Sequence, residues 1–500
     1  MVRFLPISLL CAVVLFSGAV QGQQLDYHAR LKMQAAVELL ADPQATPTLP
    51  ADAVTLMAEI GLAWDKPAVH DLPTDAFVPD TGAVLELVDI RLLLTQIAIQ
   101  TGARDHVALV RAQGDREHDV ILLRGGFARS VDLVALSKGT PAQDFITMGP
   151  DGLVLTRPLA IWSDAGLTLG AKDHLILDRP SGSFIANLGR LDVSGGKISG
   201  TAAPNAAEPA FRPFVIIAGQ GSFNGRDANF QALGFDDATV FGGLAVANNG
   251  LLAPRMPSVL KDSTLHDVGS VGLIGTTGAI VVGNWISASR GTAVLISGSK
   301  NATVSANRLS VLAGAQAIRV TAGSAMVRIA NNFLSGGART GILVDRESRN
   351  VTLSNNLVAG NLTTGINVVS ATCVILAGNL VAANGGAGIN LSDSDDVKAT
   401  RNAILFNRGS GVMVRDQKET ALVRISGNVF VGNRDGLRGA TPGNLVLADN
   451  TLDGQIPRMF GGDLSRLTVD WLRSQHDVIQ VSTSSAPISI PAPCAIGGEG

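Results

Sequence analysis

A short charged cluster stands out in the second half of the chain, where Asp345, Arg346 and Glu347 follow a short apolar run. A carboxylate can accept or deliver a proton, and an arginine can hold a substrate carboxylate through paired hydrogen bonds. Chemistry at a carbon beside a carboxylate needs both a base and a nearby cation. Asp345 is therefore a candidate catalytic residue. The alternative is a surface ion pair that compensates its own charge.

Histidine is the other residue type suited to proton transfer, because its pKa lies nearest to neutral pH. Of the seven histidines, His266, beside Asp267, lies nearest in sequence to the repetitive part of the chain, which has no tyrosine. We therefore include His266 as a second candidate catalytic residue. A histidine exposed at a turn is the structural alternative.

Arginine and asparagine side chains recur at positions expected to face outward from short strands. Arginine matches carboxylates in a bidentate geometry, which suits an acidic polymer. Ordinary solvated positions on a wet sheet face are the alternative. The candidate substrate-binding residues are Arg319, Arg346, Asn367, Asn390, Arg415 and Arg438.

The element that must position these residues is a repeat of about 24 residues between Val282 and Asn450. An asparagine closes a short apolar run once per period, and we expect its amide to bond to the asparagines of the neighbouring coils. A second asparagine column follows about five residues later, at Asn361, Asn384, Asn407 and Asn433. The first column is Asn284, Asn307, Asn332, Asn356, Asn379, Asn402, Asn428 and Asn450.

A small residue followed by an apolar, any, apolar pattern recurs at the same pace. Strand alternation places the two apolar residues on one face, as for Ile342 and Val344, and the residues between them on the other. Three short β-type segments per period, ended by Gly or Asn, predict an all-β solenoid, a right-handed parallel β-helix. Leucine-rich and helical repeats would show helical segments, which these β-branched runs lack. The expected inward pairs are Ile318/Val320, Ile342/Val344, Ile366/Val368, Ile389/Leu391 and Val412/Val414.

The chain divides into four predicted regions. Residues 1–22 read as a signal peptide, with one early cation followed by an apolar stretch. Residues 23–149 are expected to be a mostly helical region that caps the first coil, and 150–455 to be the β-helix. Residues 456–500 are expected to be a C-terminal cap and flexible tail. The helices expected in the N-terminal region are Leu25–Ala41, Ala51–Ala63 and Ala83–Thr101.

The composition of the chain limits the classes of binding partner and cofactor that we expect. The formal net charge of −3 offers no basic excess to displace counterions from nucleic acid. No membrane span is expected after signal removal, because no later apolar run is long enough. No metal-ligand spacing or nucleotide-binding motif occurs, so we expect neither a metal nor a cofactor. Cys373 lies in a strand-like run and is expected to be a core thiol and not half of a disulfide.

Several motifs resemble the periplasmic mannuronan C5-epimerases of bacterial alginate biosynthesis. Ser183–Gly189 resembles the strand that leads into the early coils of that family, and Phe211-Arg212-Pro213-Phe214 matches a family element. Asp262–Thr264 resembles the start of a coil, and Gly341–Arg346 is similar to a Gly-Ile-Val-Leu-Asp-Arg coil. The resemblance runs, with gaps, from about Asp119 to Asn450. It implies a periplasmic β-helix that acts on polymannuronate.

The catalytic motif of that family, Asp-Pro-His-Asp, is not present. The resemblance places it two coils before Asp345, where this chain has Val294 at the position of the first Asp and Ile296 at that of the His. One coil later the family has a charge-neutralising Arg. This chain has Ala322 there, or Arg319 if the register slips. Aliphatic side chains cannot transfer a proton, so only Asp345 and Arg346 are carried over, both for substrate binding.

Three hypotheses follow from these patterns. The first is a periplasmic protein that binds or guides an acidic exopolysaccharide. The second is an active C5-epimerase or lyase whose acid–base residues have moved, with His266 or Asp345 in that role. The third is a structural component of a complex with other exopolysaccharide secretion proteins.

Overall fold

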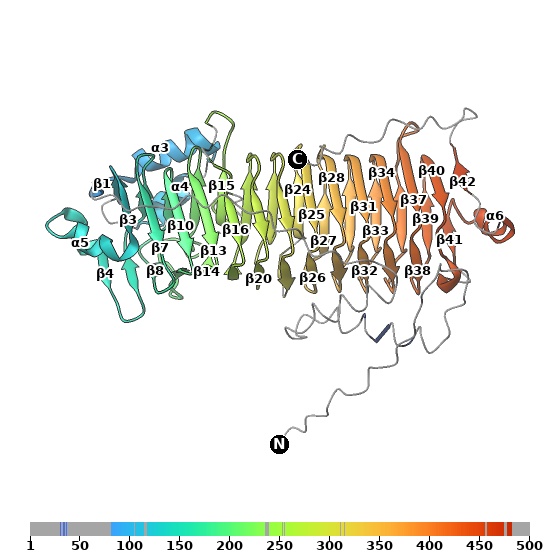
Figure 1. Cartoon of the computed structure of the whole chain (residues 1–500), viewed down its shortest axis with the longest axis horizontal. Helices are drawn as coiled ribbons and strands as arrows, with labels where there is room; N and C mark the ends of the chain where they lie inside the picture. The colour runs from blue at the N-terminus through green and yellow to red at the C-terminus, as the bar shows by residue number, and fades with distance from the viewer. Residues whose placement is uncertain are drawn as a thin grey trace, which may run out of the picture.

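Three long parallel sheets form the sides of one elongated rod in the computed structural model (Figure 1). The structure describes residues 82–482 except 105, 115–117, 236–239, 253, 255, 311, 315, 456–457 and 475–477, together with Leu31, Gln34, Ala35 and Val37. The predicted signal peptide and the helix Ala51–Ala63 lie outside the described residues. No helix within the described part is long and apolar enough to cross a membrane.

The strands of the three sheets follow one another in rotation along the chain. Sheet A contains β1 (Val84–Asp89), β2 (Asp119–Arg124), β6 (Leu159–Ile161), β9 (Ile185–Asn187), β12 (Val215–Ala218), β15 (Gly243–Ala247), β18 (Ser270–Ile274), β21 (Val294–Ser297), β24 (Gln316–Thr321), β27 (Thr340–Val344), β30 (Ile366–Val369), β33 (Ile389–Ser392), β36 (Val412–Arg415), β39 (Leu437–Ala440) and β41 (Phe460–Gly462).

Sheet B contains β3 (Phe127–Arg129), β7 (Gly166–Leu169), β10 (Arg190–Ser194), β13 (Ser222–Arg226), β16 (Val259–Lys261), β19 (Ile280–Val282), β22 (Thr303–Ser305), β25 (Ala325–Ala330), β28 (Arg349–Ser354), β31 (Thr372–Ala377), β34 (Asp395–Thr400), β37 (Leu422–Ser426), β40 (Asn444–Ala448) and β42 (Ile479–Val481).

Sheet C contains β4 (Ile146–Met148), β5 (Leu153–Leu155), β8 (His174–Leu177), β11 (Lys197–Gly200), β14 (Asn229–Leu233), β17 (Thr264–Val268), β20 (Trp285–Ser287), β23 (Arg308–Ser310), β26 (Phe333–Ser335), β29 (Leu357–Ala359), β32 (Leu380–Ala382), β35 (Ala403–Leu405) and β38 (Val429–Val431).

The coil register follows the repeat in the sequence. Val320 pairs with Val344, and Val344 with Val368, a step of 24 residues each time. All ten predicted inward residues, from Ile318 to Val414, are fully buried in one continuous aliphatic core. The predicted right-handed parallel β-helix of about 24 residues per coil is confirmed.

Both predicted asparagine columns form hydrogen-bonded ladders inside the coils. The amide nitrogen of Asn356 donates to the Oδ1 of Asn379 at 3.0 Å, and Asn379 repeats this toward Asn402 at 2.9 Å. In the second column Asn361 donates to Asn384 at 2.8 Å. Every asparagine also satisfies a backbone group, so a polar corner is buried without an unpaired amide.

From residue 82 to residue 149, the described part of the N-terminal region contains strands as well as the predicted helices. The expected helix Ala83–Thr101 divides into β1 and α3 (Ile90–Thr101), because the Asp89 carboxylate accepts the Arg91 N–H at 2.8 Å and caps the helix there. The other short helices are α4 (His106–Arg111), η1 (Ser130–Asp132), α5 (Leu133–Ser137) and η2 (Pro141–Phe145). The parallel strands begin with β2, earlier than the expected boundary at residue 150.

Antiparallel strands close the ends of the rod. At the first end β1 pairs with β2 and β4 with β5, and at the last end β42 pairs with β40. These additions cover strand edges that would otherwise be open to pairing with another molecule. The short helix η3 (Asp453–Gln455) precedes β41, and helix α6 (Leu467–Ser474) follows it.

The expectation of a core thiol at Cys373 is wrong. Cys373 is disulfide-bonded, and its partner lies outside the described residues. It occupies a left-handed position in β31 with φ 60°. The strand-like sequence around Cys373 did not reveal the disulfide, because no other cysteine lies near it in the sequence.

Candidate functional site

The outer face of sheet A changes character along the rod. Two outward columns run along it, and from β24 onward they carry most of the predicted site residues. The first column in this stretch is Arg319, Leu343, Asn367, Asn390, Met413 and Arg438. The second is Thr321, Asp345, Val369, Ser392 and Arg415.

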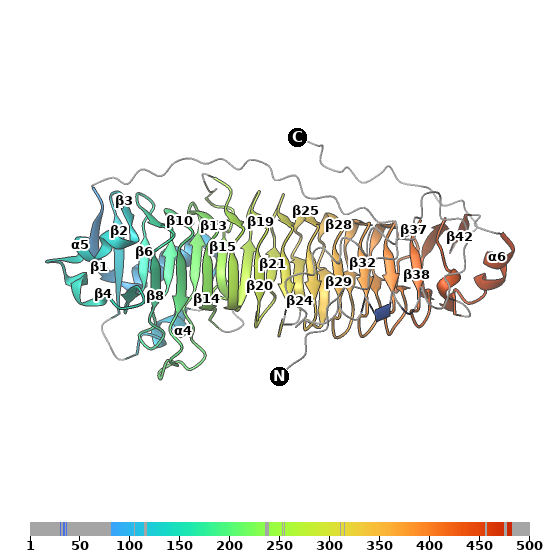
Figure 2. The ribbon, with the colours of Figure 1, turned by 60° about the horizontal axis from the view of Figure 1, so that its bottom comes forward.

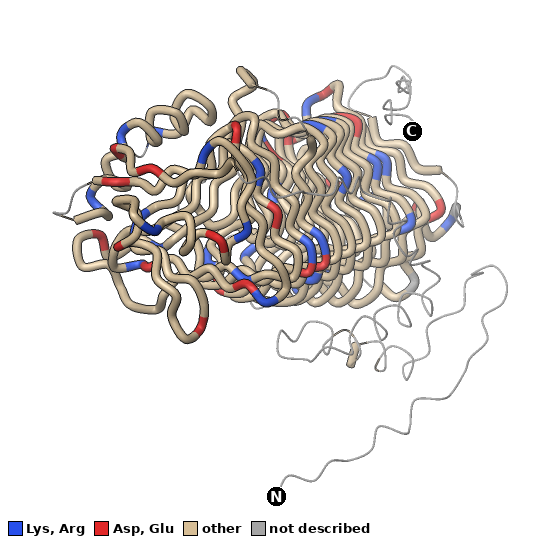
Figure 3. The backbone as a smooth tube through the Cα atoms, turned by 60° about the vertical axis from the view of Figure 1, so that its left-hand side comes forward, with Lys and Arg blue, Asp and Glu red and all other residues tan. Residues whose placement is uncertain are grey.

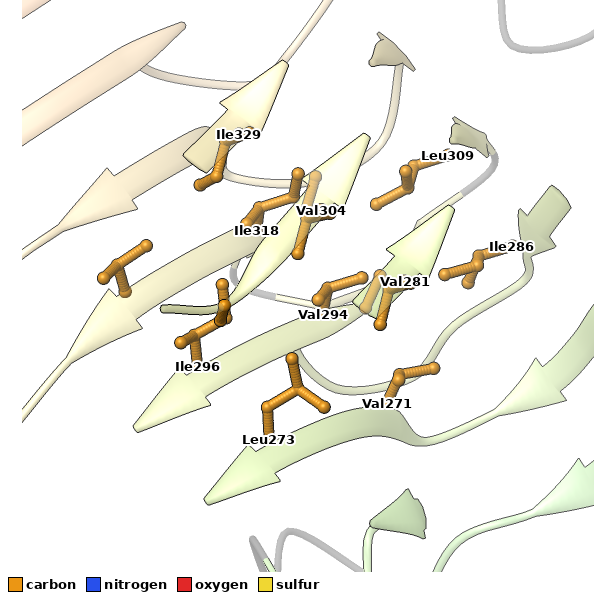
Figure 4. Close-up of a cluster of buried hydrophobic side chains, with 14 of the residues drawn as sticks. Val271, Leu273, Val281, Ile286, Val294, Ile296, Val304, Leu309, Ile318 and Ile329 are labelled. Atoms are coloured by element: carbon orange, nitrogen blue, oxygen red, sulfur yellow. The ribbon is translucent and has the colours of Figure 1, made fainter. Parts of the chain in front are cut away.

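The register in β21 differs from the sequence-based expectation by one residue. Val294 and Ile296 pair with Ile318 and Val320, and both are fully buried in the core (Figure 4). The outward columns continue instead to Leu295 and Ser297. Periodicity alone missed this, because all residues of Val294–Ile296 are apolar and either parity suits a core. Neither Leu295 nor Ser297 can replace a histidine in proton transfer.

Asp345 and Arg319 form an ion pair across adjacent coils. The Arg319 Nη2 donates to the Asp345 Oδ2 at 2.6 Å, and its Nε lies 3.4 Å from Oδ1. The Asp345 side chain is 14% exposed and that of Arg319 is 25% exposed. Arg319, predicted to bind substrate, is therefore already engaged by a carboxylate from its own chain.

An open depression of about 700 Å³ is lined by Asp345 but not by Arg319. Arg346 and Glu347 form its rim, both exposed and both with positive φ, 49° and 64°. No ion pair to Arg346 occurs within the described residues. The depression is also lined by the predicted Asn367 and by Ala322, which the resemblance placed at the position of the family's Arg. The lining residues that were not predicted are Gly323, Leu343, Val369 and Ser370.

Three predicted binding residues form a directed hydrogen-bond chain beside the depression. The Arg415 Nε donates to the Asn390 Oδ1 at 3.2 Å, and the Asn390 Nδ2 donates to the Asn367 Oδ1 at 2.7 Å. Because a guanidinium only donates, Arg415 fixes the orientation of both amides. The Asn367 Nδ2 is thereby left to donate toward a ligand in the depression.

The predicted ladder of arginines is largely paired with acids. Arg415 also contacts Asp416 at 2.8 Å, and Arg438 contacts Asp435 at 3.2 Å. Along the stacked coils, basic and acidic positions are interspersed (Figure 3). A ligand on this face would meet alternating charges and amides, and its own carboxylates would have to compete with internal partners.

His266 and Asp345 lie on different sheets and on different coils. It is exposed on β17 of sheet C, where its Nδ1 lies 3.1 Å from the Ser287 Oγ, whereas Asp345 follows β27 of sheet A. The structure does not bring the two candidate catalytic residues together. The neighbouring Asp267 instead pairs with Arg212 at 2.7 Å and with Arg290.

One of the motifs that carried the resemblance reaches this ion-pair cluster. Arg212 belongs to Phe211–Phe214, whose two phenylalanines are buried. Burial lowers the pKa of the Arg290 guanidinium, and Asp267 opposes that effect. Burial and the two neighbouring arginines also lower the pKa of Arg179. The motif thus anchors a loop to a later coil.

Comparison with known proteins agrees with the architecture. The crystal structure of the periplasmic alginate epimerase AlgG matches with a TM-score of 0.60 and 19% identity, covering 77% of this chain and 99% of that chain. The Azotobacter vinelandii mannuronan C-5 epimerase AlgE4 A-module matches with a TM-score of 0.42 and 13% identity, over 61% of this chain and 87% of that one. No curated protein sequence matches significantly. At 19% identity the likeness to AlgG establishes a shared fold.

A family model described as periplasmic copper-binding protein (NosD) matches residues 259–452. The donors in that stretch do not fit a copper site. It contains one histidine, His266, and its cysteine, Cys373, is disulfide-bonded. No cluster of three His, Cys, Asp or Glu residues occurs among the described residues. Copper sites are built from several imidazole or sulfur ligands, so the match reflects the repeat.

Proposed function

We propose that this chain is a periplasmic protein that binds an acidic polysaccharide along the outer face of sheet A. The observation that carries this proposal is the depression over Asp345 and Arg346, continued by the amide chain from Asn367 to Arg415. Together they supply a cation and several directed donors on one open face. The AlgG fold likeness supports this class of ligand.

The spacing of these groups suits a polymer. Equivalent positions recur on every coil, at steps of about 4.8 Å. A compact metabolite would use a closed pocket with converging groups, whereas this face is open along its length. A chain molecule lying across several coils could contact Arg346, Asn367 and Arg415 at once.

Affinity electrophoresis through gels that contain polymannuronate tests the proposal. Retardation of the mature protein is expected, and it should weaken with added salt because both partners are charged. A variant with Arg346→Ala and Arg415→Ala should lose most of the retardation. Arg349→Ala is the matched control, because Arg349 is an exposed arginine on sheet B. Equal loss in the control would refute a site on sheet A.

Substitution of Asp345 distinguishes a protein that only binds the polymer from an enzyme that acts on it. If the face binds polymer, Asp345→Ala frees Arg319 for a ligand carboxylate and should increase retardation. If the chain is an epimerase or lyase that uses Asp345, the wild type should produce guluronate or an unsaturated end, visible in the proton spectrum, and Asp345→Ala should abolish the product. Neither turnover nor binding with any acidic glycan would instead favour a structural role beside other secretion proteins.

A further inference from the structure

Three exposed arginines lie on the loops that enter sheet A in the last coils. Arg408 lies between β35 and β36, Arg434 lies between β38 and β39, and Arg458 precedes β41. In the part of the chain that the structure describes, none of the three guanidinium groups makes an ion pair or a side-chain hydrogen bond. We call Arg408, Arg434 and Arg458 the basic ridge.

The backbone hydrogen bonds place the ridge residues on consecutive coils. The Arg434 N–H donates to the carbonyl of Gly409, the neighbour of Arg408, at 3.0 Å, and the Gly436 N–H donates to the Arg458 carbonyl at 2.9 Å. Successive coils are about 4.8 Å apart. The ridge is therefore a short line of cations near the end of the rod where β38 and α6 lie (Figure 2).

The arginines on the outer face of sheet A differ from the ridge because acids of the chain hold them. Arg319, Arg415 and Arg438 each form an ion pair. Asp435, which follows Arg434 in the sequence, is 7% exposed and pairs with Arg438 at 3.2 Å. The chain as a whole has a formal net charge of −3, so the unpaired positive charge of the ridge is a local feature.

The opposite edge of sheet A carries the opposite charge in these coils. The loops that leave β33, β36 and β39 toward sheet B are mostly acidic. Their charged residues are Asp393, Asp416, Lys418 and Glu419. Unpaired positive charge thus gathers at the edge where the strands of sheet A begin, and it is absent from the described loops at the edge where they end.

Unpaired cations on adjacent coils repel one another, so this row is unfavourable in the free chain. A linear polyanion would relieve the repulsion, because it places one negative charge after another along the row. Each guanidinium can also hold a carboxylate in a bidentate geometry. We propose that the basic ridge binds the carboxylates of an acidic polysaccharide, as a second line of contact beside the outer face of sheet A. The ligand class rests on the proposed function, whereas the residues are separate from those assigned there.

Affinity electrophoresis through polymannuronate gels measures the contribution of the ridge. A variant of the mature chain with Arg408→Gln and Arg434→Gln should bind the polymer several-fold more weakly, and its retardation should depend less on salt. The matched control, Arg349→Gln with Arg401→Gln, removes the same charge from two exposed arginines, one on β28 and one after β34. This control should bind as the wild type does, and an equal loss in it would refute a local site.

The same gels separate a failure of the ridge from a failure of the proposed function. Retardation that is lost in Arg346→Ala with Arg415→Ala, but unchanged in the ridge variant, would refute the ridge and leave the site on sheet A. The reverse result would support the ridge and refute that site. A wild type that is not retarded at all would overturn both.

Two measurements without polymer complete the test. Arg434→Gln should raise the urea midpoint at low salt, because it removes a repelled cation, and added salt should abolish the difference. A lower midpoint would show that the chain itself holds Arg434, which would overturn the proposal. A doubled molar mass that salt and the ridge variant both reverse would instead assign the ridge to the acidic edge of a second copy.

Discussion

The two halves of the outer face of sheet A share one backbone geometry but have different surroundings. In the first half, Ile216 and its column neighbours are apolar and lie under α3 and a phenylalanine cluster. In the second half, the same column carries the partly exposed Arg319 and Asn367 and the buried Asn390. The column residues of the first half are Leu122, Ala160, Ala186, Ile216 and Ala245.

The difference shows that the inward and outward residues of a solenoid are under different constraints. Inward residues are alike in both halves, because each coil must bury the same aliphatic stripe on its neighbour. Outward residues do not take part in this stacking, so their types depend on what covers each part of the sheet. Small and apolar outward residues accompany a cover from the same chain, and polar outward residues leave a face available to another molecule.

The largest effect is expected in the phenylalanine cluster of the covered half. Phe214 is fully buried, and its ring centroid lies 4.6 Å from that of Phe184 and 4.9 Å from that of Phe241. Phe214→Ala should lower the free energy of unfolding by about 3–5 kcal/mol, measured by urea denaturation. Met413→Ala, a partly exposed position of the open half, should cost less than about 1 kcal/mol. Similar losses at both sites would erase the distinction.

A matched polar substitution tests the same contrast in one column. Ile216→Asn buries an unpaired amide under the cover and should cost about 2–4 kcal/mol. Leu343→Asn changes the equivalent outward position of the open half, where water can bond to the amide, and should cost less than about 1 kcal/mol. Denaturation midpoints of the two variants give the comparison. If Leu343→Asn proved the more harmful, the second half would have to be covered as well.

A smaller effect is expected from the ion pair of the open half. Arg319 and Asp345 are close but partly exposed, at 25% and 14%. A double-mutant cycle with Arg319→Ala and Asp345→Ala should give a coupling energy of about 0.5–1 kcal/mol that falls with salt. A coupling of zero would show that the guanidinium is available to ligands without competition.

The smallest expected effect is the contribution of His174, in the early coils, to the pH dependence of stability. Burial lowers the pKa of His174 below 6.5, and its ring nitrogens lie 2.7 Å from the Asp151 carbonyl oxygen and 2.8 Å from the Ser199 Oγ. As pH falls below 6.5, the unfolded chain binds the proton first, so stability should decrease. His174→Gln should remove this part of the dependence. Unfolding midpoints at about pH 7.5 and about pH 5.5 provide the measurement.

The sequence by itself determined the coil period, both asparagine ladders and the inward pairs such as Ile342 and Val344. These features are local, because each coil repeats the same contacts with its neighbour about 24 residues away. The position of Asp345 and Arg346 on an open face followed from the same parity. Only one coil of the site region, at Val294–Ile296, was placed out of register, since an all-apolar strand carries no parity signal.

Only the tertiary structure decided the partners and the covers. The sequence does not show that Arg319 is held by Asp345 or that Arg212 reaches Asp267. Each of these facts joins residues that are not related by the repeat. Their contacts depend on the path of loops, whereas the repeat specifies only how one coil stacks on the next.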